Sequence, residues 1–137
     1  MTHTHIEKTI FIKAPPSKVW TYLTDKAKLG EWFHPANTDL KHGGKYALLN
    51  DKGEDMCWGT VVTADKPHTL IYTFTHKWLE GVETTVEWHL SEVHGGTMIK
   101  LNHFGFEDAP TDTFEMLSSH DKGWDDHFSR LRERAAE

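Results

Sequence analysis

Residues 111–136, TDTFEMLSSHDKGWDDHFSRLRERAA, decide the fold. Steps of three or four residues place these side chains on one face of a helix of about seven turns: Phe114, Leu117, Asp121, Trp124, Phe128, Leu131 and Ala135. Pro110 lies just ahead of the helix start, Asp112 supplies a carboxylate to the first turn, and no proline follows. A helix of this length with one inward face requires a surface to pack against.

The chain before Pro110 supplies that surface, because much of it alternates between apolar and polar residues as β-strands do. Strands are predicted at 6–13, 39–41, 45–49, 56–63, 69–76, 82–93 and 97–106, and short helices from Ser17 and from Asp25 to about Trp32. Successive hairpins make the sheet antiparallel. The predicted fold is therefore α+β, a curved antiparallel sheet of about seven strands wrapped on a long C-terminal α-helix, with two short helices after the first strand and a single domain over 1–137.

The composition excludes several classes of protein. The 137 residues include six Trp, seven Phe and three Tyr, enough to build a core without disulfides. Cys57 is the single cysteine and no signal peptide is recognisable, which favours a reducing, cytoplasmic location. No apolar run approaches the length of a membrane span. The formal charge is −6 and basic residues are dispersed, so nucleic acid is not expected as a partner.

A series of short motifs along the chain carries a family resemblance. The motifs are Ala14-Pro15-Pro16-Ser17-Lys18-Val19-Trp20, Leu23-Thr24-Asp25, Glu31-Trp32-Phe33, Asp39-Leu40, Gly43-Gly44-Lys45-Tyr46, Gly59-Thr60-Val61, Leu70-Ile71-Tyr72-Thr73-Phe74, Gly96-Thr97, Gly105-Phe106 and Gly123-Trp124. In this order they resemble the SRPBCC superfamily, and within it the branch named for the C-terminal domain of the heat-shock-protein-90 ATPase activator. The resemblance covers nearly the whole chain. It implies a START-like helix-grip fold with a hydrophobic cavity between helix and sheet, and it transfers no catalytic motif.

Aromatic side chains are the first candidates for lining such a cavity. Trp32 and Phe33 end the second short helix, Tyr72, Phe74 and Trp88 lie on strands, and Trp124 lies on the long helix. Leu117 shares the inward helix face. These residues either bind an apolar or amphipathic ligand or simply fill the core, and the sequence leaves both interpretations open.

Three ionisable residues are candidates for chemistry in the same cavity. Asp121 interrupts the apolar helix face, where it either acts as a base or pairs with a lysine at the helix edge. His103 shares a strand face with Ile99 and Leu101, and His76 follows Phe74. Each histidine either contacts a ligand or is a core residue with satisfied hydrogen bonds. His120 and His127 are expected to flank the helix face in solvent.

No metal site or cofactor is predicted, since the histidines and Cys57 show no recognised ligand spacing and no phosphate or dinucleotide loop is present. The leading hypothesis is non-catalytic binding of a small hydrophobic or amphipathic molecule. One alternative is an enzyme with Asp121 or His103 as acid or base. Another is an interaction domain like a co-chaperone, although the chain leaves no room for the activator's additional N-terminal domain. A homodimer is compatible with the sequence, which specifies no interface.

Overall fold

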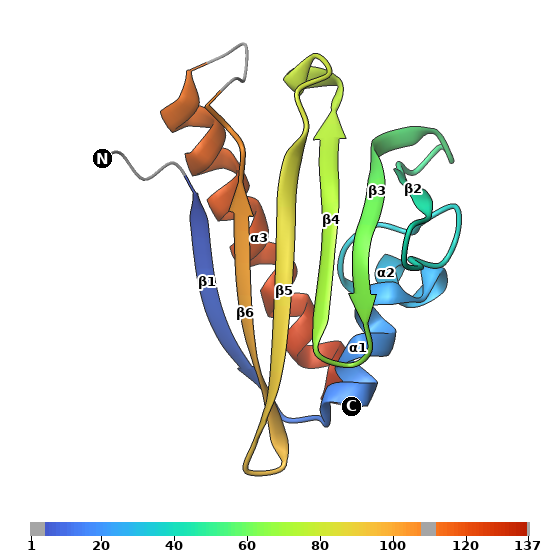
Figure 1. The fold of residues 1–137 in the computed structure, drawn as a ribbon, viewed down its shortest axis with the longest axis vertical. Helices are drawn as coiled ribbons and strands as arrows, with labels where there is room; N and C mark the ends of the chain where they lie inside the picture. Colours follow the sequence, from blue (N-terminus) through green and yellow to red (C-terminus); the bar gives the residue numbers. More distant parts are fainter. Residues whose placement is uncertain (1–4, 108–111, 137) are drawn as a thin grey trace.

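The computed structural model describes residues 5–107 and 112–136, and shows one antiparallel sheet with three α-helices (Figure 1). The sheet order is β1-β6-β5-β4-β3-β2. Its strands are β1 (Ile6–Ile12), β2 (Lys45–Leu49), β3 (Asp55–Asp65), β4 (Thr69–His76), β5 (Thr84–Val93) and β6 (Gly96–Phe104). The helices are α1 (Pro16–Thr24), α2 (Lys26–Trp32) and α3 (Thr113–Ala135), with a 3-10 turn, η1, at Lys77–Leu79. The α+β helix-grip prediction is confirmed.

Local signals in the sequence explain where the helices begin. Pro16 occupies the first turn of α1, where its missing N–H costs nothing. The Asp25 carboxylate caps α2 by accepting from the N–H groups of Ala27 and Lys28, both at 3.0 Å. Asp112 caps α3 by accepting from the N–H of Glu115 at 3.1 Å. Pro110 and Thr111, which were expected at the start of this helix, lie outside the described residues.

The register of the sheet gathers apolar side chains on the face that α3 crosses (Figure 1). On β6, Ile99, Leu101 and His103 are fully buried, which confirms the predicted parity. His103 lies opposite Val86 of β5, and Trp88 lies opposite Leu101. At the centre of the core, the Trp88 ring meets Trp32 of α2 and Trp124 and Phe128 of α3 edge-on, with ring centroids 5.6–5.8 Å apart.

Two predictions about the elements are wrong. Residues 39–41 form no strand, so the described sheet has six strands rather than about seven. Their polar groups instead bond to helix ends, since Leu40 donates its N–H to the Thr24 carbonyl and Asp39 accepts from the Lys26 N–H. The inward face of α3 is also shorter than predicted. Burial begins at Trp124, whereas Phe114 is 75% exposed.

Candidate ligand-binding pocket

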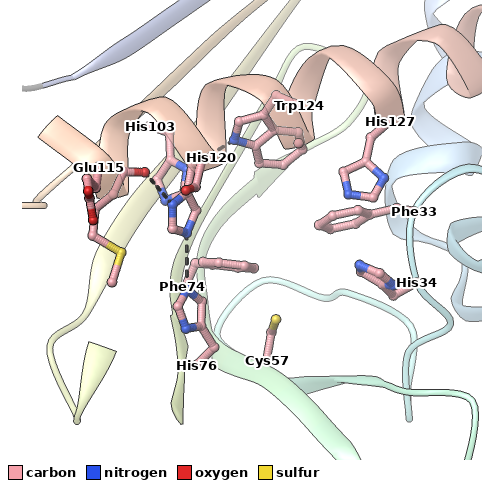
Figure 2. A pocket seen from close by; sticks show the side chains of 13 residues that line it. Phe33, His34, Cys57, Phe74, His76, His103, Glu115, His120, Trp124 and His127 are labelled. Carbon is pink, nitrogen blue, oxygen red and sulfur yellow. Dashed lines mark hydrogen bonds between the residues drawn. The ribbon is translucent and has the colours of Figure 1, made fainter. Parts of the chain in front are cut away.

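A pocket of about 490 Å³ lies between the first half of α3, the end of α2 and the edge of the sheet where β3 begins and β4 ends (Figure 2). Its lining residues are Phe33, His34, Cys57, Phe74, His76, His103, Glu115, Met116, Ser119, His120, Gly123, Trp124 and His127. Aromatic rings and imidazoles make up most of this wall. Figure 2 shows Phe74, His76 and His120 at one end of the pocket and Phe33, His34 and His127 at the other.

At the first end, β4 and α3 bring two histidines together. The rings of His76 and His120 are stacked at 5.2 Å, and their Nε2 atoms are 3.1 Å apart. His120 Nδ1 lies 2.7 Å from the Met116 carbonyl oxygen one helical turn earlier. Because a carbonyl only accepts, His120 carries its proton on Nδ1 and its Nε2 accepts from His76. Burial lowers the pKa of His76 to about 4, aided by His120, and burial also lowers the pKa of His120.

His103 lies deeper, behind Phe74 and Trp124, and both of its ring nitrogens have partners. The Trp124 indole N–H donates to His103 Nδ1 at 3.1 Å. His103 Nε2 therefore carries the proton and donates to Thr84 Oγ1 at 2.7 Å, while that hydroxyl donates to the Phe74 carbonyl at 2.7 Å. Burial, with the neighbouring His120 and His76, holds the pKa of His103 well below its ordinary value. His103 thus orients Trp124 in the pocket wall.

The opposite end of the pocket is organised by Arg130. Its Nη2 donates to His127 Nδ1 at 2.7 Å, and its Nε donates to the Trp32 carbonyl at 3.2 Å. His127 meets His34 with ring centroids 5.2 Å apart and Phe33 at 4.6 Å, both edge-on. Burial lowers the pKa of His127 to about 4, with help from His34 and Arg130. Burial and then Arg130 also lower the pKa of His34.

Gly123 and Cys57 lie on facing walls of the pocket. A Cβ atom on Gly123 would meet nothing within 4 Å, so the absence of a side chain leaves this part of the pocket open. Cys57 is buried on β3, and burial raises its pKa to about 12. A thiol with so high a pKa is a weak nucleophile at neutral pH, as expected for a small packing residue.

The comparison with protein families gives one match, to the model described as "Activator of Hsp90 ATPase homolog 1-like protein", over residues 13–136. The chain belongs to this family. No match was found among curated proteins. In the described residues of this family member, no helix is long and apolar enough to cross a membrane, and no cluster of three potential metal ligands was found.

Solved structures share the fold of this Hsp90-activator-like chain. CalU16 from Micromonospora echinospora has a TM-score of 0.78 at 25% identity, covering 96% of this chain and 76% of that one. An HSP90 activator from Plasmodium falciparum has a TM-score of 0.72 at 26% identity, covering 88% and 86%. The Aha1 dimer from Colwellia psychrerythraea, at 19% identity, has a TM-score of 0.79 and covers 96% of each chain.

The structure distributes the predicted site residues of this family member among three places. Five line the pocket: Phe33, Phe74, His76, His103 and Trp124. Three are buried in the core beside it: Trp32, Tyr72 and Trp88. Leu117 and Asp121 line a separate hollow of about 660 Å³ that also includes residues of β1. Asp121 and His103 therefore do not line one cavity, as an acid–base pair would require.

Asp121 lies at the edge of α3, where a lysine compensates its charge. Lys8 Nζ of β1 lies 2.8 Å from both Asp121 Oδ1 and Asp125 Oδ1. Burial alone would lower the pKa of Lys8, but the hydrogen bonds and charges of these carboxylates outweigh burial and raise it. The interpretation of Asp121 as a lysine-paired residue at the helix edge is the one that fits this geometry.

Sequence reasoning missed three pocket histidines on or near α3. The prediction that His120 and His127 flank the helix in solvent is wrong, because both are half-buried and line the pocket. His34, from the loop after α2, was not considered as a pocket residue. A signal was present in the helix, since residues 116, 120, 123 and 127 also recur at steps of three and four. This second stripe has Met116 as its one large apolar residue and otherwise contains a glycine and two histidines.

Proposed function

We propose that the pocket binds a small apolar or amphipathic molecule. The observation that carries this proposal is a cavity of about 490 Å³ that remains between α3 and the sheet although the chain is rich in large aromatic residues. Its size and its mixture of aromatic walls with a few polar groups are typical of small-molecule sites. The wall is also anchored, because Trp124 and His127 are both held by hydrogen bonds to groups behind them.

The proposal is binding without turnover. Asp121 faces Lys8 outside the pocket, and the nitrogens of His103 already bond to Thr84 and Trp124. Neither residue is placed to exchange a proton with a molecule in the pocket. This arrangement favours binding over the acid–base alternative.

A pair of matched variants tests the proposal. Gly123→Leu places a branched side chain in the open part of the pocket, whereas Ser129→Leu adds the same side chain to an exposed position of α3. A screen of lipids, sterols and polycyclic aromatic molecules by thermal shift and tryptophan fluorescence should give hits on the native chain. A ligand at a hundredfold its Kd adds about 2.7 kcal/mol of stability. Gly123→Leu should abolish the shift and Ser129→Leu should retain it. Equal shifts in both variants would refute binding in this pocket.

A second candidate function is stimulation of the Hsp90 ATPase, favoured by the family match and by the similarity to the Plasmodium falciparum activator. The test is the ATPase rate of purified Hsp90 with and without this chain. A rise in rate that saturates with chain concentration would support the function. An unchanged rate, with no complex detected by sedimentation, would count against it.

A further inference from the structure

The hydrogen bonds around the pocket determine which histidines are neutral. A guanidinium group and an indole N–H can only donate. Since Arg130 donates to His127 Nδ1 at 2.7 Å and Trp124 donates to His103 Nδ1, each of these nitrogens carries a lone pair. His127 Nδ1 also lies 3.3 Å from the Trp32 carbonyl oxygen, but that oxygen already accepts from Arg130 Nε, and the shorter contact with Arg130 assigns the lone pair. Both rings are therefore neutral, with the proton on Nε2.

The His76–His120 pair has the same restriction. The facing Nε2 atoms are 3.1 Å apart and one proton lies between them. Protonating both rings fully would direct two N–H groups at each other, so at least one ring of the pair stays neutral. This geometric conclusion agrees with the pKa values lowered to about 4 for His76 and His127.

Formal charge is confined to the margin of the pocket. Among the thirteen described residues that line it there is no lysine or arginine, and Glu115 is the one carboxylate and is exposed. Arg130 lies behind His127, where the Trp32 carbonyl and the His127 ring receive its N–H groups. The interior thus offers hydrogen bonds and aromatic surfaces without a full charge.

We propose that this pocket selects neutral, flat aromatic molecules that carry a hydroxyl group, that is, phenols in their protonated form. The proposal rests on the binding function proposed above. Arg130 occupies Nδ1 of the neutral His127 and leaves its Nε2 N–H for a ligand, and the His34 ring lies beside it. A hydroxyl group can accept from one of these rings and donate to the other. Phe33, Phe74 and Trp124 line the pocket and provide the aromatic contact surface. A carboxylate or an ammonium group would lose its hydration without meeting an opposite charge inside.

The test uses four probes with one ring skeleton: 2-naphthol, naphthalene, 2-naphthoate and 2-naphthylmethylammonium. Calorimetric titration of the full chain at pH 7 should give 2-naphthol a Kd about tenfold lower than the two charged probes and severalfold lower than naphthalene. Equal or tighter binding of either charged probe overturns the inference while leaving the binding function in place. So does equal binding of naphthalene and 2-naphthol. If none of the four binds but the screen of lipids and sterols gives a hit, this inference fails and the binding function stands; if neither gives a hit, both proposals fail.

Two variants locate the hydrogen bond. His127→Phe keeps an aromatic ring beside Phe33 but removes the imidazole, whereas His89→Phe makes the same change on β5, outside the pocket. The preference for 2-naphthol over naphthalene should fall severalfold in His127→Phe or in His34→Phe, and persist in His89→Phe. Retained naphthalene binding shows that a variant is folded. An unchanged preference in both pocket variants would overturn the assignment.

Discussion

Thr84 shows how a single residue links the sheet to the pocket wall. Its hydroxyl accepts from His103 and donates to the Phe74 carbonyl, and His103 in turn receives the indole N–H of Trp124. Thr84 and His103 are both fully buried, so no water replaces a lost partner. The position of Trp124 in the pocket therefore depends on a hydroxyl group on β5.

Replacing Thr84 by valine should destabilise the chain by about 1–3 kcal/mol, because the buried His103 N–H and Phe74 carbonyl lose their partner at nearly constant volume. Urea denaturation gives the free energy of unfolding. Thr85→Val, at the next and partly exposed position of β5, is the matched control and should change stability by less than about 0.5 kcal/mol. Equal effects of the two variants would contradict the role given to Thr84.

The neutral histidines also make stability depend on pH. The pKa values of His76 and His127 are lowered to about 4 in the folded chain, from an ordinary value near 6.5, so the unfolded chain binds more protons between these limits. The contribution of these two neutral rings to the free energy of unfolding should therefore be complete above about pH 6.5 and should decrease as the pH falls toward 4. Each ring contributes at most about 3 kcal/mol, and less because both line a pocket that is open to solvent.

Urea titrations at pH 7.5, 5.5 and 4.5 measure this dependence. His127→Phe should flatten the decline, and His89→Phe should leave it unchanged. A decline that is as steep in His127→Phe as in the native chain would show that other groups cause it.

At the scale of the element, α3 has two environments. From Trp124 onward its inward residues Trp124, Phe128, Leu131 and Ala135 are buried in the core. Before Trp124 the helix forms one wall of the pocket on one side, through Met116 and His120, and bonds to β1 on the other side. Gly123 lies at the boundary. One continuous helix thereby serves as core element and as pocket wall.

Replacing Gly123 by alanine should stabilise the chain by up to about 1 kcal/mol, because alanine favours the helix and its Cβ meets no atom within 4 Å. Gly59→Ala is the opposite case, since a Cβ there would collide with the Thr73 carbonyl oxygen on β4. That variant should lose several kcal/mol or fail to fold. Thermal and urea unfolding distinguish the two, and a destabilised Gly123→Ala would indicate that the helix bends at this residue.

The contact between α3 and β1 should contribute little to stability. Asp121 is about half exposed and shares Lys8 with Asp125, so Asp121→Asn leaves one carboxylate in place. We expect a loss below about 1 kcal/mol, reduced further at high salt, and unchanged affinity for any ligand of the pocket. Denaturation at low and high salt measures the loss of stability, and ligand titration measures the affinity. A large fall in affinity would show that Asp121 contributes to ligand binding.

At the scale of the whole molecule, Trp88 connects the layers. From β5 its ring meets Trp32 of α2 and Trp124 and Phe128 of α3, and its indole N–H donates to the Tyr72 hydroxyl at 3.1 Å. The sheet, the short helices and α3 therefore share one core. The pocket lies beside this core, so its shape depends on the same packing.

Replacing Trp88 by alanine should cost about 3–5 kcal/mol, because the cavity left behind adjoins three elements at once. Trp58→Ala, at an outward position of β3 that is 39% exposed, should cost less than about 1 kcal/mol. Circular dichroism and tryptophan fluorescence should report one coincident transition in both variants. If the helices and the sheet unfold separately in Trp88→Ala, the core does not couple them.

The sequence alone determined the fold, because periodicity and turn residues act locally. Alternation along β5 and β6, the helix start at Asp25 and the spacing from Trp124 to Ala135 each follow from a few neighbouring residues. The inward orientation of His103 could be predicted from the same alternation. The strand proposed at 39–41 failed because three residues carry too little pattern to compete with the hydrogen bonds offered by nearby helix ends.

Only the tertiary structure determined which candidate site residues lie close together in the folded chain. His76 and His120 are 44 residues apart and meet because β4 and α3 pack against each other, and Arg130 reaches both His127 and the end of α2. Asp121 shares the predicted helix face with Trp124 but is directed to Lys8 of β1, since α3 crosses the sheet obliquely (Figure 1) and its first turns leave the core. Periodicity assigns a residue to a face, whereas the angle at which two elements cross determines what that face meets.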